Sequence, residues 1–63
     1  DGVNGMDLLD IVEMFVDWKA ASERHQDGNI YDSILKNKER FNLSPQLVDI
    51  FINTAYNLQW LKE

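Results

Sequence analysis

The chain has 63 residues, 44% of them hydrophobic, and its eleven acidic and six basic side chains give a net charge of −5. This length allows one domain at most, the absence of cysteine excludes disulfides and thiolate metal sites, and no apolar run approaches the roughly 20 residues of a membrane span. The negative charge argues against nucleic acid, because a protein must neutralise phosphates with a basic surface.

The first predicted helix runs from about Asp7 to His25 and follows a flexible, glycine-containing lead-in over residues 1–6. Asp7 is expected to be the N-cap or a first-turn acid, where the helix dipole favours negative charge. Gly28 is expected to adopt the left-handed conformation that ends a helix.

The second predicted helix spans Ile30 to Arg40. Asn29 can cap its start, and Asp32 occupies the third position that completes a capping box. Asn42 is expected to end this helix.

The third predicted helix has the clearest start, because Ser44 is a preferred N-cap and Pro45 suits the first helical position. Apolar and small residues then recur in a heptad-like seam: Leu47, Phe51, Thr54, Leu58 and Leu61. Together the three helices predict an all-α domain over residues 7–63, arranged as an orthogonal or up-down bundle.

The first helix has an unusually wide apolar surface, which covers well over half of its circumference. Its members are Leu8, Leu9, Ile11, Val12, Phe15, Val16 and Trp18. Two short partner helices cannot cover so much, so we expect either a homo-oligomer or the remainder of the same polypeptide to pack there. The first residue is Asp1 and not methionine, which fits the expectation that the chain is a piece of a longer, cytoplasmic protein.

A narrow polar band on the same helix contains Asp10, Glu13, Asp17 and Arg24. One interpretation is a solvated helix face with Asp17 and Arg24 loosely paired. The other is a set of carboxylates that project into a cavity, where Asp10 and Asp17 could supply a hard-cation ligand or a general base. Both interpretations stay open at this point.

The segment from Glu13 to Trp18, followed by Lys19-Ala20-Ala21 and by Gly28, carries a family resemblance. It resembles the C-terminal portion of a family of bacterial and phage proteins known only as a domain of unknown function. Members have an E-M-x-x-D-W signature late in the chain, and upstream histidine motifs similar to those of HD-type metal-dependent phosphohydrolases. The resemblance extends over residues 4–58.

This resemblance implies a larger helical HD-like fold that binds divalent metal, such as Mn or Mg, and hydrolyses phosphoesters with a metal-activated water. It implies that Asp17 is a catalytic and metal-binding acid, that Glu13 is a second catalytic residue, and that Trp18 packs behind them. Arg24 would orient Asp17 or meet a phosphate. The His-Asp pair of the family is absent here, and His25 is expected to be a surface or dipole-stabilising residue, so this chain by itself should be inactive.

Two functions remain in competition. The first is the inactive C-terminal portion of an HD-like hydrolase, whose partner is the rest of its own polypeptide. The alternative is a helical interaction module that dimerises or docks through the apolar surface of the first and third helices. Trp60 fits either a core position or a partner-binding anchor. An acidic mimic of nucleic acid is disfavoured by the lysines and arginines scattered among the acids.

Overall fold

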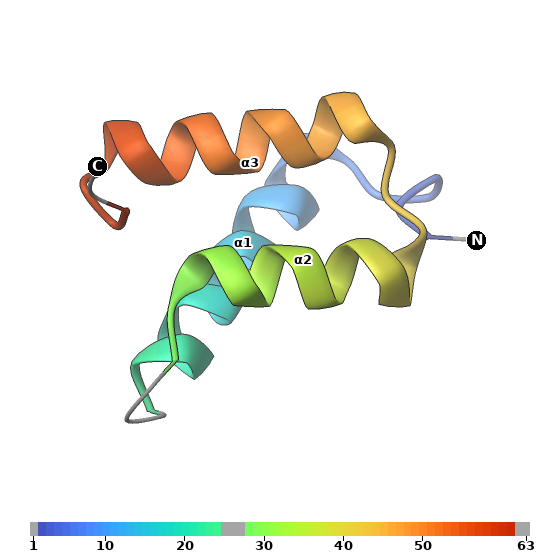
Figure 1. Ribbon diagram of the computed structural model, residues 1–63. Helices are drawn as coiled ribbons and strands as arrows, with labels where there is room; N and C mark the ends of the chain where they lie inside the picture. Colours follow the sequence, from blue (N-terminus) through green and yellow to red (C-terminus); the bar gives the residue numbers. More distant parts are fainter. Residues whose placement is uncertain (1, 25–27, 62–63) are drawn as a thin grey trace.

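The computed structural model describes residues 2–24 and 28–61, and three α-helices form its framework (Figure 1). Helix α1 spans Leu8–Glu23, α2 spans Ile30–Phe41 and α3 spans Pro45–Asn57. Helices α2 and α3 lie side by side and run in opposite directions (Figure 1). Helix α1 packs against α2 and crosses behind it in the view of Figure 1. This arrangement confirms the prediction of an all-α three-helix bundle. None of these helices is long and apolar enough to cross a membrane.

The starts of α1 and α2 are fixed by local side-chain hydrogen bonds. In α1, Oδ1 of Asp7 accepts the N–H of Asp10 at 2.8 Å, and Oδ2 of Asp10 accepts the N–H of Asp7 at 3.1 Å. In α2, Oδ1 of Asn29 accepts the N–H of Asp32 at 2.9 Å, whereas the Asp32 carboxylate accepts from the Asn29 side-chain amide at 3.3 Å. Both predicted N-caps are therefore confirmed. The reciprocal capping box forms at α1 and not at α2, where it was predicted, because Asp32 accepts from the Asn29 side chain and not from its backbone N–H.

The start of α3 is the one that the sequence defined most clearly. Oγ of Ser44 accepts the N–H of Leu47 at 3.2 Å, and Pro45 occupies the first helical turn. Proline costs no hydrogen bond there, because the first N–H groups of a helix have no partner within it. The N-cap prediction is confirmed.

The end of α1 differs from the prediction. The helix stops at Glu23, and the N–H of Arg24 donates to the carbonyl of Ala21 at 3.1 Å, which tightens the last turn. Gly28 lies four residues beyond the C-cap Arg24, so it is not the residue that ends the helix, contrary to the prediction. His25, the expected last-turn cation, lies outside the described residues.

Asn42 ends α2 in the left-handed conformation, with φ of 52° and ψ of 52°. Asparagine tolerates this region better than most residues. The N–H of Leu43 then donates to the carbonyl of Lys38 at 3.0 Å, and the Leu43 side chain turns into the core. The predicted end of α2 is confirmed.

The predicted seam of α3 runs past the end of the helix and is wrong at Leu58. The helix ends at Asn57, and the N–H groups of Trp60 and Leu61 fold back onto the carbonyl of Ala55, at 2.8 and 3.2 Å. Leu58 is outside the helix and 49% exposed. Of the predicted seam, Phe51 is buried, and Leu47 and Leu61 are partly buried against the core. Val48 and Ala55 are the other buried residues of α3.

Aromatic rings join α1 to α3 in the centre of the core. Phe15 stacks on Phe51 with ring centroids 4.9 Å apart, and Trp18 meets Phe51 edge-on at 5.1 Å. The partly buried Trp60 lies 5.2 Å from Phe15. These offset and edge-on contacts add to the burial of apolar area. Trp18 is thus a core residue, and Trp60 covers the edge of the same cluster.

The N-terminal lead-in lies against the end of α2. Gly2 has φ of 67°, and a Cβ atom there would come within 2.4 Å of the carbonyl oxygen of Phe41. A Cβ atom added at Gly5 would meet no atom within 4 Å. Val3 packs against the core and accepts the N–H of Met6 at 3.0 Å.

Replacing Gly2 with alanine should lower the free energy of unfolding by about 1 kcal/mol, because the added methyl group meets backbone and the left-handed φ is strained. Urea denaturation followed by circular dichroism measures this change. Gly5→Ala is the matched control and should leave the stability unchanged or slightly raised. Equal stabilities for the two variants would show that the lead-in does not contribute to the fold.

Candidate functional site

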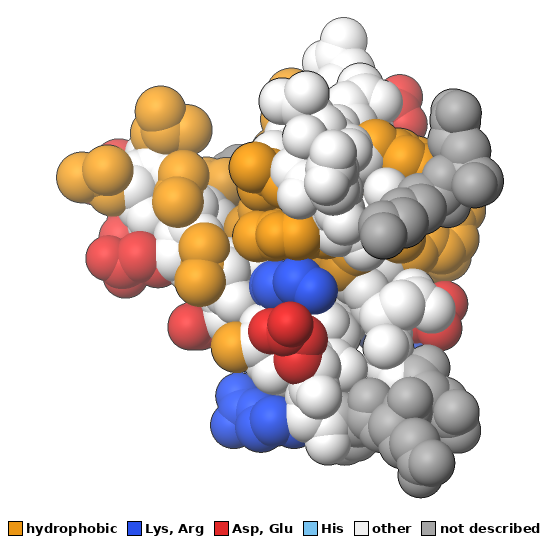
Figure 2. All heavy atoms as spheres, turned by 90° about the vertical axis from the view of Figure 1, so that its left-hand side faces the viewer, with side chains coloured by type: hydrophobic (Ala, Val, Ile, Leu, Met, Phe, Trp, Pro, Cys, Tyr) orange, Lys and Arg blue, Asp and Glu red, His pale blue; other side chains and the backbone are white. Residues whose placement is uncertain are grey.

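One side of α1 is apolar and uncovered. Leu8 is 75% exposed, Leu9 71%, Val12 51% and Val16 50%. Residues three and four apart are neighbours on a helix, so these four side chains form one continuous surface, here called the α1 stripe. Figure 2 shows hydrophobic side chains following one another along the projecting part of the molecule. The prediction that this helix carries more apolar surface than its two companions cover is confirmed.

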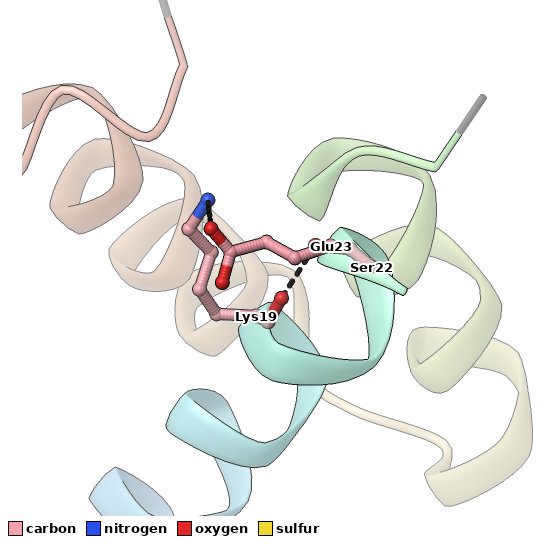
Figure 3. A network of polar contacts seen from close by, with 3 residues as sticks. All are labelled: Lys19, Ser22 and Glu23. Carbon is pink, nitrogen blue, oxygen red and sulfur yellow. Dashed lines mark hydrogen bonds and ion pairs between the residues drawn. The ribbon is translucent and has the colours of Figure 1, made fainter. Parts of the chain in front are cut away.

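The side of α1 that adjoins Leu8 and Val12 is buried through Phe15, Trp18 and Ser22. Ser22 is a polar residue in this face, and its hydroxyl donates to the carbonyl of Lys19 at 2.8 Å (Figure 3). Its hydrogen-bonding demand is therefore met within the helix, as burial requires. Burial of this face leaves the α1 stripe turned away from α2 and α3.

Lys19 borders the α1 stripe on the side nearer the core. Its Nζ lies 3.4 Å from a carboxylate oxygen of Glu23, one turn later (Figure 3). The same Nζ is 5.5 Å from the centre of a Trp60 ring, within reach of a cation–π interaction. This positive charge is already engaged by two neighbours.

Three carboxylates border the α1 stripe on its other side. Asp10, Glu13 and Asp17 are exposed and follow at spacings of three and four, so they share one face. We call them the acidic row. They line a shallow hollow of about 390 Å³, whose remaining lining residues are Met6, Met14, Trp18 and Phe41.

The structure brings Glu13 and Asp17, the two predicted catalytic residues, to the rim of this hollow. It does not pair Asp17 with Arg24: the one ion pair found over residues 2–24 and 28–61 is Lys19–Glu23. Arg24 is instead the C-cap of α1.

The acidic row does not form a metal site by itself. Carboxylate oxygens suit Mg²⁺ and Mn²⁺, but the described part of the chain contains no group of three His, Cys, Asp or Glu residues placed to hold an ion. A metal at Asp17 would therefore need most of its ligands from elsewhere. The carboxylates alone offer a negative, hydrogen-bond-accepting surface.

The far wall of the hollow could not be found from sequence. Met6 lies in the lead-in and Phe41 at the end of α2, and no short-range spacing joins either to the acidic row. A second hollow of about 490 Å³ is lined by uncharged residues of the lead-in and the α2–α3 connection. Among residues 2–24 and 28–61, none of those that line this second hollow is an acid or a base.

The described features place the molecule among small three-helix domains with an aromatic core, one uncovered apolar helix face and an acidic border. The chain belongs to a family of unknown function, DUF5662, whose model matches residues 1–57. No curated protein and no solved structure matches it. The match confirms the resemblance at the level of a family of unknown function, and the α1 stripe and acidic row both lie inside the matched region.

Proposed function

We propose that this chain is a helical packing module that joins other protein mass through the α1 stripe. The observation that supports this proposal is the continuous exposure of Leu8, Leu9, Val12 and Val16 on one helix face. Single exposed apolar residues are ordinary on protein surfaces, whereas a contiguous apolar patch with a polar border is typical of an interaction site.

The free energy available from this surface is large for so small a chain. Full burial of one leucine or valine side chain is worth about 1.5–3 kcal/mol. Covering the α1 stripe would thus contribute several kcal/mol, close to the whole stability of about 3–9 kcal/mol expected for a domain of this length. A partner therefore gains substantially by packing here.

Photo-crosslinking in the native host tests this function. A photoreactive phenylalanine analogue at Val12 should give a discrete crosslinked product, because Val12 lies in the middle of the α1 stripe. Mass spectrometry then distinguishes another segment of the same polypeptide, a second copy and a different protein. The same analogue at the exposed Gln46 of α3 is the matched control and should give little product.

A second change makes the test specific. Leu8→Gln with Leu9→Gln removes apolar area beside the crosslinker and should abolish the product while circular dichroism stays unchanged. If Val12 gives no more product than Gln46, the packing function is wrong.

The second candidate function is the C-terminal portion of an HD-like metal-dependent phosphohydrolase that is inactive alone, in a cytoplasmic protein of bacterial or phage origin. Its support is the place of Glu13 and Asp17 beside the α1 stripe. Protein that packs on the stripe would also come against these carboxylates and could complete a site with its own ligands.

Under this candidate function, Asp17→Asn in the full-length protein should lower kcat/KM for a simple phosphoester by about 10–100-fold, the range found when groups that support a metal site are changed. Steady-state hydrolysis with added Mn²⁺ measures the effect. Asp49→Asn, an exposed acid on α3, is the control and should retain full activity. Unchanged activity in the Asp17 variant would remove this residue from the catalytic group.

A further inference from the structure

We infer that the occupant of the α1 stripe is a basic amphipathic helix of a partner protein, one that carries lysine or arginine beside its apolar residues. This inference rests on the proposed packing function and adds the chemistry of the partner.

The first border carries two exposed acids, Glu13 and Asp17, and the basic residue of the same band, Arg24, lies two turns beyond Asp17 at the end of α1. Leu9, Glu13 and Asp17 follow one another at spacings of four and so lie in one line along the helix. This line is adjacent to Leu8, Val12 and Val16. Figure 2 shows acidic side chains directly beside the projecting hydrophobic ones. A helix that packs on the stripe must therefore place its own flanking residues near the Glu13 and Asp17 carboxylates.

The opposite border offers no free positive charge to balance this line. Lys19 is the basic residue there, and it is held by Glu23 at 3.4 Å and lies over the Trp60 ring. The surface that a partner meets is therefore apolar in the centre and net negative at its edges. Complementary potentials across an interface raise the association rate and exclude wrong partners.

A second copy of this chain is a poor occupant for the same reason. Each copy carries a net charge of −5, so two copies repel at long range. An antiparallel pair of α1 helices would place each acidic border against its own symmetry mate. A parallel pair would place it beside Lys19, whose charge is already shared with Glu23. Neither arrangement neutralises Glu13 and Asp17.

Basic residues one turn apart on a partner helix would match the spacing of Glu13 and Asp17. Both carboxylates are exposed, and neither forms a hydrogen bond or ion pair with the rest of the described chain. They can therefore accept a partner's charges without breaking any internal contact. Their contribution should be strongest at low ionic strength, where exposed charges are least screened.

The test uses three fluorescently labelled peptides of about 18 residues, a length that allows helix formation, with identical leucine positions and with Lys, Gln or Glu at the flanking positions. Fluorescence anisotropy against the chain gives each dissociation constant. At about 0.01 M salt the Lys peptide should bind about tenfold more tightly than the Gln peptide, and the Glu peptide should bind most weakly. At about 1 M salt, where screening acts within about 3 Å, the three should become similar.

Two variants separate the inference from the proposed function. Glu13→Gln with Asp17→Asn should abolish the preference for the Lys peptide and retain binding of the Gln peptide. Leu8→Gln with Val12→Gln should weaken binding of all three peptides, whereas the control Ile50→Gln, which removes an exposed apolar residue from α3, should not.

Equal binding of the three peptides that still depends on Leu8 and Val12 would overturn the inference and leave the packing function standing. If the Leu8→Gln, Val12→Gln variant binds the peptides as tightly as the parent chain does, or if no peptide binds the parent chain, the inference is overturned and the packing function is contradicted as well. A stable dimer at low salt, seen by sedimentation and lost in the Leu8/Val12 variant, would identify a second copy as the occupant and overturn the basic partner.

Discussion

Replacing Phe51 with alanine is expected to lower the free energy of unfolding by about 3–5 kcal/mol. Phe51 is 3% exposed, stacks on Phe15 and is in edge contact with Trp18. Truncation of a buried phenylalanine costs about 3–5 kcal/mol. A domain of this length has a stability of only about 3–9 kcal/mol, so one ring accounts for a large share of the folded state.

The measurement is urea denaturation followed by circular dichroism and by tryptophan fluorescence, because Trp18 lies against the deleted ring. The matched control is Ile50→Ala, which changes the neighbouring residue of the same helix at a position that is 57% exposed. That variant should stay within about 0.5 kcal/mol of the parent chain, as surface substitutions do. A stability loss of the same size in both variants would contradict the aromatic core described for α1 and α3.

Replacing Ile34 with alanine should lower the free energy of unfolding by about 2–5 kcal/mol, the usual cost of an aliphatic truncation in a core. Ile34 is completely buried and lies on α2, the helix that packs against both of the others. The cavity would therefore weaken two helix contacts at once. Thermal and urea unfolding give the change in stability.

Leu35→Ala is the control for this change, because Leu35 follows Ile34 directly and is 39% exposed. Its loss should cost less than about 1 kcal/mol, since its side chain gains less from burial. If the two variants lose the same stability, the face of α2 that meets the core has been misassigned.

The starts of the helices and the end of α2 were predictable because the signals that set them are local. Asn29 and Ser44 each accept a backbone N–H three residues ahead, and Asn42 tolerates a positive φ. Only a few residues decide each of these features, so their chemical identities are sufficient.

The ends of α1 and α3 were predicted less well, since contacts along one helix do not determine them. Gly28 was expected to end α1, but the helix stops at Glu23. The seam of α3 was extended to Leu61, yet the chain leaves the helix after Asn57 and folds back onto Ala55. The end of α3 is set by this fold-back, which joins Trp60 and Leu61 to the last turn of the helix.

The candidate site was predictable in part for the same reason. The spacing of Glu13 and Asp17 places them on one helix face, and the wide apolar surface of α1 was visible from the positions of its residues around the helix. The hollow beside the acidic row was not, because Met6 and Phe41 reach it through the packing of the lead-in and α2. The hollow is therefore formed by long-range packing, which the spacing of residues along one helix does not reveal.

The fold-back after α3 has a consequence for what counts as the smallest independent unit. The family match stops at residue 57, whereas the core is closed by Trp60, which covers Phe15 from three positions further along. A fragment cut at the family boundary would keep all three helices and lose the ring that seals their aromatic centre. The residues that build the aromatic core therefore extend beyond the segment that the family model matches.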